Sequence, residues 1–418
     1  MPTITEESAF TREFVDRYSR EQREPDWLRQ RRFEGLLVSD ELPLPGGKLD
    51  WTKLKLGELA PSRFLALRHQ VGADFSPPFA VPDLAKSGVI FCDFATALRQ
   101  HPQLIEKYFM TTVVPARSSK FAAMHAAFWT HGTFLYVPAG VELKMPLRTE
   151  LRAGGKNAAH FAHTLIVVER HAKLTYLDHY KSPTEEGQGL FDGVTEIILG
   201  EGANLVYVAE QQWGRHVWDV STRRAMLARD ASLTWLNLGL GGAASKVRLD
   251  VILDGAGASA ELLGVTVAQP GQSVCYDTLQ DHRVPYTKSN LLFKAAVKER
   301  AHTAYEGTIR VHKGAQKTDA YQASRNLLLG KNARADATPI LEIEANDVRC
   351  THGATVGPVD PEQLFYLRSR GLSVEDSTRL MMRGFFDQAM RYIPDEILRE
   401  QLWQAVDQAM GDIQIDQP

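Results

Sequence analysis

Short runs of β-branched and aromatic residues recur through the middle of the chain, from about residue 121 to residue 349. Residues 132–137, 164–168 and 173–177 are typical, and runs of this kind favour strands. Between the runs a loose motif repeats, in which a polar turn leads into alanine and then into an alternating strand. Its copies are residues 169–176, 200–207, 228–235, 254–260, 298–304, 311–317 and 330–335.

Successive copies of the motif often lie about 20 to 30 residues apart, a spacing at which each repeat is one supersecondary unit that stacks on its neighbours. A small alanine at each corner lets the chain turn tightly between flat faces, while inward side chains form a continuous core. The pattern therefore predicts a mainly β fold with a solenoid core. A β-sandwich with regular turns is the alternative that the same pattern allows.

Helical patterns flank the predicted strands. The first forty residues indicate two helices, the second with Pro25 at its first helical position and a stop at the turn-rich residues 42–47. Another helix is expected near residues 95–109, within a stretch that mixes short apolar runs with proline and glycine.

After residue 357 the periodicity becomes helical again. Asp360 is expected to cap a helix that starts at Pro361, Ser373 to cap a second helix, and Pro394 to start a third. The apolar face expected for the second helix consists of Leu380, Met381, Phe385, Ala389 and Ile393. These patterns predict an N-terminal helical or mixed region (residues 1–118), a β core (residues 119–357) and a C-terminal helical module (residues 358–418).

Composition narrows the class of protein. The 418 residues carry 48 Lys and Arg against 51 Asp and Glu, a formal net charge of -3, so no strong field favours nucleic acid or an anionic membrane as a partner. The polar N-terminus lacks secretory features, and the apolar runs are far shorter than the ~20 residues of a membrane span. Three widely spaced cysteines, Cys92, Cys275 and Cys350, fit a reducing cytosol. We therefore expect a cytoplasmic protein.

Most catalytic signatures are missing. The chain has no Gly-x-x-x-x-Gly-Lys-[Ser/Thr] motif and no nucleophile elbow, so any ATP hydrolysis must come from a partner. The alternative hypothesis is a β-helical carbohydrate-active enzyme, because such solenoids can carry acid or base groups in an external groove. The candidate pairs are Asp281 with His282 and Asp178 with His179. Adjacent strand residues point to opposite faces, which disfavours both pairs.

Cys350 and His352 form the best candidate for a metal site. Residues two apart in a strand project from the same face, which would bring a thiolate and an imidazole together as potential iron ligands. Two ligands do not complete a tetrahedral site, so the others would come from elsewhere. A buried cysteine beside a hydrogen-bonded histidine explains the same pair without metal.

Four histidines also cluster in the sequence: His160, His163, His171 and His179. Their spacings do not match the paired histidines of zinc enzymes, and strand alternation would scatter them over different faces. Surface or hydrogen-bonding roles are therefore favoured. Cys92 and Cys275 are expected to be ordinary buried thiols.

Residues 346–357, followed by residues 362–371, form a long and unusual string that resembles the signature of the SufB/SufD family. Residues 287–294, 315–322, 326–330, 338–343, 24–28 and 132–138 extend the resemblance over most of the chain. Residues 178–199 correspond to the region in which SufB carries its scaffold cysteine, and they contain no cysteine. This difference favours the SufD branch of the family.

The resemblance implies a right-handed parallel β-helix flanked by helical segments, in a non-catalytic subunit of the SUF complex for iron–sulfur cluster assembly. The implied partners are a SufB-like paralogue and the ATPase SufC, the latter bound through the C-terminal helices; the isolated chain could form a homodimer. In the family, the residues matching Cys350 and His352 lie at the SufB interface. The implied cofactor is thus a transient iron or iron–sulfur cluster at that interface, with none firmly bound to the isolated chain, and with His352 favoured over Cys350. The sequence leaves open whether flavin binds the complex.

Overall fold

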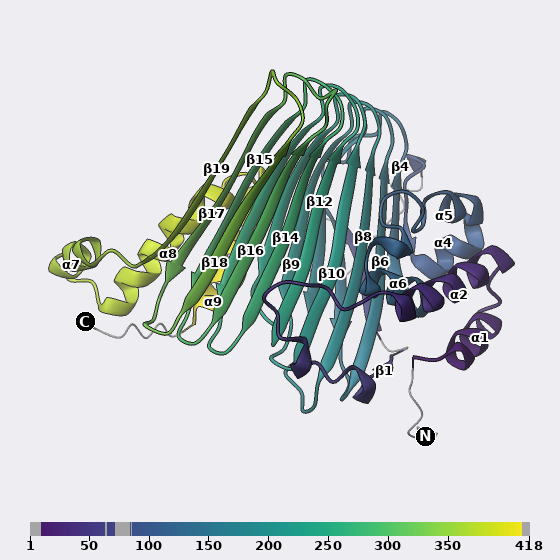
Figure 1. Ribbon diagram of the computed structural model, residues 1–418, viewed down its shortest axis with the longest axis horizontal. Coiled ribbons are helices and arrows are strands. Elements are labelled where there is room, and N and C mark those ends of the chain that lie inside the picture. The colour runs from purple at the N-terminus through teal and green to yellow at the C-terminus, as the bar shows by residue number, and fades with distance from the viewer. Residues whose placement is uncertain (1–9, 63–64, 72–83, 85, 412–418) are drawn as a thin grey trace.

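The computed structural model describes residues 10–62, 65–71, 84 and 86–411, and these form a long solenoid of strands with helices at both ends (Figure 1). Two parallel sheets run along the solenoid. Sheet A contains β1 (Ala60–Pro61), β3 (Ile90–Asp93), β4 (His131–Val137), β6 (Ala158–Val168), β8 (Gly189–Leu199), β10 (Val217–Leu227), β12 (Ala244–Leu253), β14 (Ser273–His282), β16 (His302–Val311) and β18 (Arg334–Ile343). Sheet B contains β2 (Leu65–Val71), β5 (Leu147–Ala153), β7 (Lys173–Lys181), β9 (Asn204–Gln212), β11 (Ser232–Gly239), β13 (Ser259–Ala268), β15 (Lys288–Val297), β17 (Asp319–Leu328) and β19 (Arg349–Pro358).

The chain contributes one strand to each sheet in every coil. From β4 onward, each strand pairs in parallel with the strand two places along the chain, so β6 lies between β4 and β8, and β7 between β5 and β9. Antiparallel pairing in the described residues is confined to β2 with β5 and β3 with β4. A sandwich would instead pack two antiparallel sheets. The predicted parallel solenoid is therefore confirmed, and the sandwich alternative is wrong.

Alanine corners make the tight turns possible. At five corners a residue with positive φ, between 56° and 77°, directly precedes an alanine that is at most 1% exposed. The pairs are His171 with Ala172, Gly202 with Ala203, Asp230 with Ala231, Gly257 with Ala258, and Arg300 with Ala301. The left-handed residue reverses the chain direction, and the small side chain fills the corner without pushing the sheets apart.

In-register columns of side chains fill the interior. Tyr176, Tyr207 and Trp235 occupy matching positions in β7, β9 and β11, with ring centroids 6.0 and 5.4 Å apart. All three side chains are buried. Because every coil repeats the same inward positions, an inward residue can be recognised from its register with a buried neighbour.

The N-terminal helices cover the outer face of sheet A near the start of the solenoid (Figure 1). They are α1 (Arg12–Glu21), α2 (Asp26–Glu41), α4 (Phe94–Gln100), α5 (Pro102–Tyr108) and α6 (Lys120–Phe128), with short 3₁₀ turns η1 (Trp51–Lys53), η2 (Leu56–Glu58) and η3 (Ala116–Ser118).

Three details differ from the sequence prediction here. Pro25 precedes α2 as its N-cap instead of opening it. The helix expected near residues 95–109 is broken into α4 and α5, because His101 leaves helical geometry immediately before Pro102. The start of the expected β core is helical, since Ser119 caps α6 and residues 121–128 are all buried against the solenoid. The first solenoid strand therefore begins at His131.

The C-terminal helices are α7 (Pro361–Ser369), α8 (Val374–Met390) and α9 (Glu396–Met410). Asp360 and Ser373 cap α7 and α8 as expected, but the cap of α9 is Asp395 and Pro394 lies outside the helix. The apolar face predicted for α8 is confirmed in part: Ala389 and Ile393 are buried, and Met381 and Phe385 are partly buried. Leu380 is exposed, and the prediction missed Met382 and Phe386, which are buried.

Helices α8 and α9 pack on the outer face of sheet B, where they bury a row of leucines and valines. Two lysines connect these helices to sheet B by hydrogen bonds. Lys294, in β15, donates from Nζ to the Phe385 carbonyl oxygen at 2.5 Å, and Lys298, in the turn after β15, donates from Nζ to the Met410 carbonyl oxygen at 2.5 Å. The second contact places a cation at the C-terminus of α9, where the helix dipole favours it. No helix in the described ranges has the length and apolarity that crossing a bilayer requires.

Candidate functional site

The last coil of the solenoid is open. Strand β18 pairs with β16 and β19 with β17, and neither has a second strand neighbour among the described residues (Figure 1). An edge strand presents unpaired backbone N–H and C=O groups, and so provides a template for a strand from another chain.

The inner face of this last coil is apolar and exposed. Leu341 and Ile343 in β18 are 36% and 39% exposed, and Val356 in β19 is 47% exposed. Leu341 and Ile343 lie in register with Ile309 and Val311, which are fully buried one coil earlier. The coil therefore exposes positions that the rest of the solenoid uses as core, and a surface of this kind marks an interaction site.

Cys350 and His352 lie on this same inner face of β19. They are in register with Ala320 and Gln322, both of which are buried inside the solenoid. The expected same-face arrangement is therefore present, whereas metal binding by the pair stays a prediction. Cys350 is half-buried and packs beside the small apolar cluster that contains Ala320, while His352 is exposed.

The two side chains differ in readiness to bind a metal. Burial, with a smaller contribution from the nearby Asp319 carboxylate, raises the pKa of the Cys350 thiol. A thiol with a raised pKa stays protonated, and it must lose that proton before it becomes a ligand. His352, in contrast, presents its imidazole to solvent.

Gln322 forms a fixed layer directly behind His352. Its Oε1 accepts a hydrogen bond from the Tyr305 hydroxyl at 3.2 Å, and its Nε2 donates to the carbonyl oxygens of Gly307 at 3.0 Å and Ile340 at 3.4 Å. Sequence reasoning missed Gln322, because only the register of β17 and β19 places it there.

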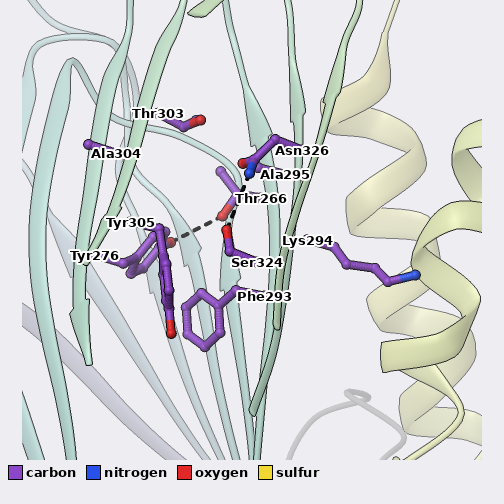
Figure 2. A pocket seen from close by; sticks show the side chains of 10 residues that line it. All are labelled: Thr266, Tyr276, Phe293, Lys294, Ala295, Thr303, Ala304, Tyr305, Ser324 and Asn326. Carbon is purple, nitrogen blue, oxygen red and sulfur yellow. Dashed lines mark hydrogen bonds between the residues drawn. The ribbon is translucent and has the colours of Figure 1, made fainter. Parts of the chain in front are cut away.

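A small cavity of about 20 Å³ lies in the interior next to this layer, with Tyr276, Tyr305, Thr266 and Ser324 in its wall (Figure 2). The Tyr276 hydroxyl bonds Thr266 at 3.3 Å, and Asn326 bonds Ser324 at 3.2 Å. A cavity of this volume holds about one water molecule and is too small for an organic cofactor.

Cys350 and His352 lie without a third metal-ligating side chain beside them among the described residues. In the part of the chain that the structure describes, no three His, Cys, Asp or Glu side chains form a group able to hold a metal ion. The pair can therefore contribute at most two ligands, and a complete site needs donors from a second chain.

The four clustered histidines lie apart. His160 points into the solenoid, where its Nε2 contacts the Gly154 carbonyl oxygen at 3.0 Å, and His171 occupies a corner. His163 is buried on the outer face of sheet A, and His179 on the outer face of sheet B. The scattering expected from strand alternation is thus present.

His163 belongs to a buried cluster that the sequence did not reveal. Its Nδ1 lies 3.2 Å from Nε2 of His125 in α6, and its Nε2 lies 3.2 Å from Oε2 of Glu196. Glu196 also accepts the backbone N–H groups of Met110 and Val114, at 2.7 and 2.9 Å. These contacts join the N-terminal region to the solenoid. Burial raises the pKa of Glu196 to about 8 and lowers that of His163 to about 3.

The remaining thiols behave as expected for buried cysteines. Cys275 is buried and Cys92 half-buried, and all three cysteines are free. Burial raises the pKa of both Cys92 and Cys275 to about 11, so neither is an activated nucleophile.

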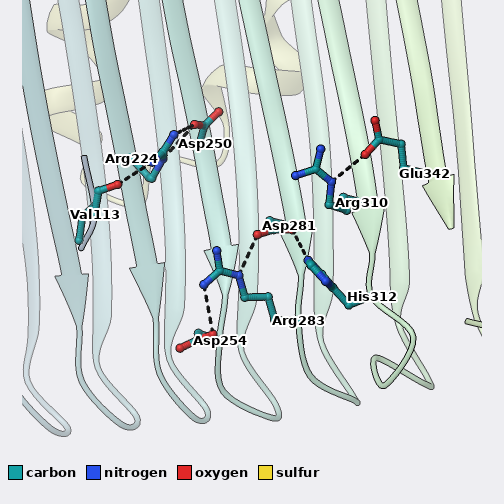
Figure 3. Close-up of polar contacts among 9 residues, drawn as sticks. All are labelled: Val113, Arg224, Asp250, Asp254, Asp281, Arg283, Arg310, His312 and Glu342. Atoms are coloured by element: carbon teal, nitrogen blue, oxygen red, sulfur yellow. Dashed lines mark hydrogen bonds and ion pairs between the residues drawn. The ribbon is translucent and has the colours of Figure 1, made fainter. Parts of the chain in front are cut away.

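The two carboxylate–histidine pairs of the enzyme alternative do not form. Asp281 lies on the outer face, where it bonds Arg283 and His312 at 2.9 Å each (Figure 3), while His282 lies inside and bonds Thr287. Asp178 lies inside and accepts hydrogen bonds from Tyr176, Tyr180 and Tyr207. Its neighbour His179 is on the opposite face. The structure therefore gives the carbohydrate-enzyme alternative no support.

Comparison with known proteins shows which family the chain is similar to. Residues 151–385 match the family model described as "SUF system FeS cluster assembly, SufBD core domain", and residues 71–149 match "SufBD protein N-terminal region". A curated relative from Bacillus subtilis, the iron–sulfur cluster assembly protein SufD, is 31% identical over 96% of this chain and 98% of its own length. SufBD family proteins from Staphylococcus saprophyticus and Staphylococcus epidermidis are each 28% identical over 93% of this chain and 91% of their own length.

The matches cover the solenoid, the open coil that carries Cys350 and His352, and part of the C-terminal helical module. The SufD relative also agrees with the branch predicted from the missing scaffold cysteine. The chain therefore belongs to the SufBD family of SUF-system iron–sulfur cluster assembly proteins.

Proposed function

We propose that this protein is the SufD-like subunit of a SUF complex, in which its open last coil docks against a SufB-like paralogue and its C-terminal helices bind a SufC-like ATPase. His352, assisted by Cys350, contributes to an iron or iron–sulfur cluster site that the paralogue completes. Iron or the nascent cluster is here the cargo of the complex. The ATPase activity resides in the partner.

The observation that carries the proposal is the uncovered core of the last coil. Leu341, Ile343 and Val356 need a cover, and the edges of β18 and β19 can pair with strands of another chain. A relative with the same solenoid would end in an equivalent edge, so the two open coils could join into a continuous structure. His352 and Cys350 would then lie between the two chains.

A second copy of this chain is the competing occupant of the open coil. It presents the same edges and the same apolar face, so a homodimer would cover the surface when the paralogue is absent. The isolated chain is therefore expected to dimerise, and the paralogue to displace the second copy.

The ATPase surface is proposed on the outward side of the helical module. Phe365 in α7 is 74% exposed, and Tyr366 and Leu380 are also more than half exposed. Aromatic side chains of this kind are frequent anchors of protein interfaces. The inward faces of α8 and α9 are already covered by sheet B, so they are not available to a partner.

Because α8 and α9 cover sheet B, deleting them is not a suitable test of the proposed ATPase surface. Deleting the chain from Ser373 onward would uncover the apolar outer face of sheet B and so destabilise the core. Substitutions of exposed α7 residues test the surface without that effect.

Co-purification tests the proposal as a whole. The tagged chain, co-expressed with a SufB-like paralogue and a SufC-like ATPase, should yield a stable complex of all three proteins. Recovery of a homodimer alone, under conditions in which both partners are soluble and folded, would refute the proposed assembly.

A further inference from the structure

Four ionisable side chains lie in one buried row where the N-terminal region meets sheet A. The row consists of Asp192 and Glu196 in β8, His163 in β6 and His125 in α6, and none of the four is more than 1% exposed. The rings of Phe94 and Phe109 pack on His163, with centroids 5.3 and 4.6 Å from that of the imidazole. Burying four such groups is costly, and the proposed assembly function uses none of them.

The hydrogen atoms of both imidazoles can be assigned from one backbone oxygen. His125 Nδ1 lies 3.2 Å from the carbonyl oxygen of Asp192, which only accepts, so Nδ1 carries the hydrogen. Burial lowers the pKa of His125 well below its usual value, so the ring is neutral and its Nε2 is an acceptor. This Nε2 lies 3.2 Å from Nδ1 of His163, which must donate. Burial lowers the pKa of His163 to about 3, so its Nε2 carries no hydrogen.

This assignment requires a proton on Glu196. Its Oε2 lies 3.2 Å from Nε2 of His163, and an ionised carboxylate there would place two acceptors against each other. Burial raises the pKa of Glu196 to about 8, which agrees with a carboxylic acid at neutral pH. Nε2 of His163 makes no aligned hydrogen bond, so it can either accept or donate one.

Asp192, at the other end of the row, has an unused donor. Both of its carboxyl oxygens are buried without a hydrogen bond, although Oδ1 lies 3.6 Å from Nδ1 of His125. Burial, with the nearby Asp219 carboxylate, raises the pKa of Asp192 well above its usual value, so this group also keeps its proton. A buried carboxylic acid without a partner needs an explanation, and its O–H group lies beside His125.

The other charges that act on the row are those of Arg31 and Arg32 in α2 and of Arg224 and Asp219 in β10. The three arginines already donate to oxygen atoms outside the row. The two carboxyl groups are therefore neutralised by their own protons.

We propose that this row is a proton-linked switch, which reverses the tautomers of both histidines when Glu196 ionises. The Glu196 proton passes to Nε2 of His163, the Nδ1 proton of His163 passes to Nε2 of His125, and the Nδ1 proton of His125 is released to solvent. Nδ1 of His125 is then an acceptor, and the Asp192 carboxylic acid is the donor that it needs. The ionisation of Glu196 is thereby transmitted to the contact between α6 and β8.

Nitrogen NMR of the isolated full-length chain, labelled with ¹⁵N-histidine, is the direct test, because the shifts of the two ring nitrogens show which one carries the hydrogen. Between pH 6 and pH 9.5 we expect His125 and His163 to change together from the Nδ1–H to the Nε2–H tautomer, with one midpoint at about 8. His125→Gln and His163→Gln assign the signals. His160 is the internal control, because its Nε2 faces the Gly154 carbonyl oxygen at 3.0 Å and should keep its hydrogen throughout.

Two substitutions test the ends of the row. Glu196→Gln cannot ionise, so both rings should keep one tautomer over the whole pH range. Asp192→Leu fills a similar space but removes the donor that the switched state needs. Because coupling between two sites is reciprocal, this change should raise the midpoint by roughly half a pH unit or more, whereas a merely structural role of Asp192 would leave the midpoint unchanged.

A ring of His125 or His163 that keeps one tautomer from pH 6 to pH 9.5 in the unsubstituted protein would overturn the inference, as would separate midpoints for the two rings. A tautomer change that persists in Glu196→Gln, or a midpoint that does not move in Asp192→Leu, would also overturn it when circular dichroism shows the variant to be folded.

Discussion

His352 is in register with Gln322, so the exposed imidazole of the last coil lies on top of a side chain that is completely buried. Gln322 is itself fixed by hydrogen bonds from Tyr305 and to Gly307 and Ile340. A rigid layer therefore supports an exposed ligand candidate, which is the arrangement that a site completed by a second chain needs.

The corner alanines should tolerate no larger side chain. Ala231 is fully buried after Asp230, whose φ is 56°. Ala231→Leu should lower the free energy of unfolding by about 1–3 kcal/mol, because a corner without free volume must move to accept three more carbons. Urea denaturation measures the effect. Ala139→Leu, at an exposed turn, is the control and should be neutral; equal effects of the two substitutions would contradict the corner argument.

Glu196 should make stability depend on pH. The folded protein holds this proton with a pKa of about 8, whereas an unfolded glutamate titrates near 4.3. Between these values the folded state binds more protons than the unfolded state, so the contribution of Glu196 to stability falls as pH rises and is constant above about 8.

Glu196→Gln removes this titration. The free energy of unfolding of the variant, relative to the unsubstituted protein, should rise between pH 5 and pH 8 by up to ~1.4 kcal/mol per pH unit. Denaturant melts at pH 5, 6.5 and 8 measure this difference, with Glu400→Gln, at an exposed position of α9, as control. A difference that does not vary with pH would show that Glu196 is already ionised in the folded protein.

A charged side chain on the apolar face of the open coil should weaken binding of the paralogue. Ile343→Asp should leave the isolated chain folded, because Ile343 is 39% exposed there, but should weaken binding of the SufB-like paralogue at least tenfold. Leu37→Asp on α2, at an exposed apolar position distant in sequence and fold, is the matched control. Binding measured by sedimentation should separate the two variants, and equal affinities would place the interface elsewhere.

Phe365 should anchor the ATPase. Phe365→Glu on α7 should weaken ATPase binding at least tenfold, because removal of a central aromatic side chain typically costs 2 kcal/mol or more. Thermal unfolding of the isolated chain should be unchanged, since Phe365 is largely exposed. Leu37→Glu again serves as control. Normal ATPase binding by Phe365→Glu would show that the outward side of α7 is not the docking surface.

The repeating turn and alanine motif was enough to predict the solenoid, because each corner has a local cause in a left-handed residue and a small neighbour. The spacing of Cys350 and His352 was enough to predict a common face for the same reason. Strand alternation is a local property that a sequence shows directly.

Long-range packing was not predictable in this way. Residues 120–128 form a helix in which residues 121–128 are all buried against the solenoid, so no alternation of apolar and polar positions marks the helix in the sequence. The contacts of His163 with His125 and Glu196 join residues 38 and 33 positions apart and leave no motif. The position of Gln322 behind His352 likewise depends on register between coils and cannot be read from either segment alone.

The contribution of His352 to a cluster site is the central claim, and cluster loading of the reconstituted complex tests it most directly. His352→Ala and Thr351→Ala chains are assembled anaerobically with the SufB-like paralogue and the ATPase, and iron and acid-labile sulfide are then measured over time. Thr351 lies in register with Tyr321, whose side chain is exposed, so it points away from His352 and is the matched control. We predict that both variants assemble with their partners and that only His352→Ala loses most of its iron and sulfide. Cluster loading by His352→Ala at the normal rate and stoichiometry would contradict the claim.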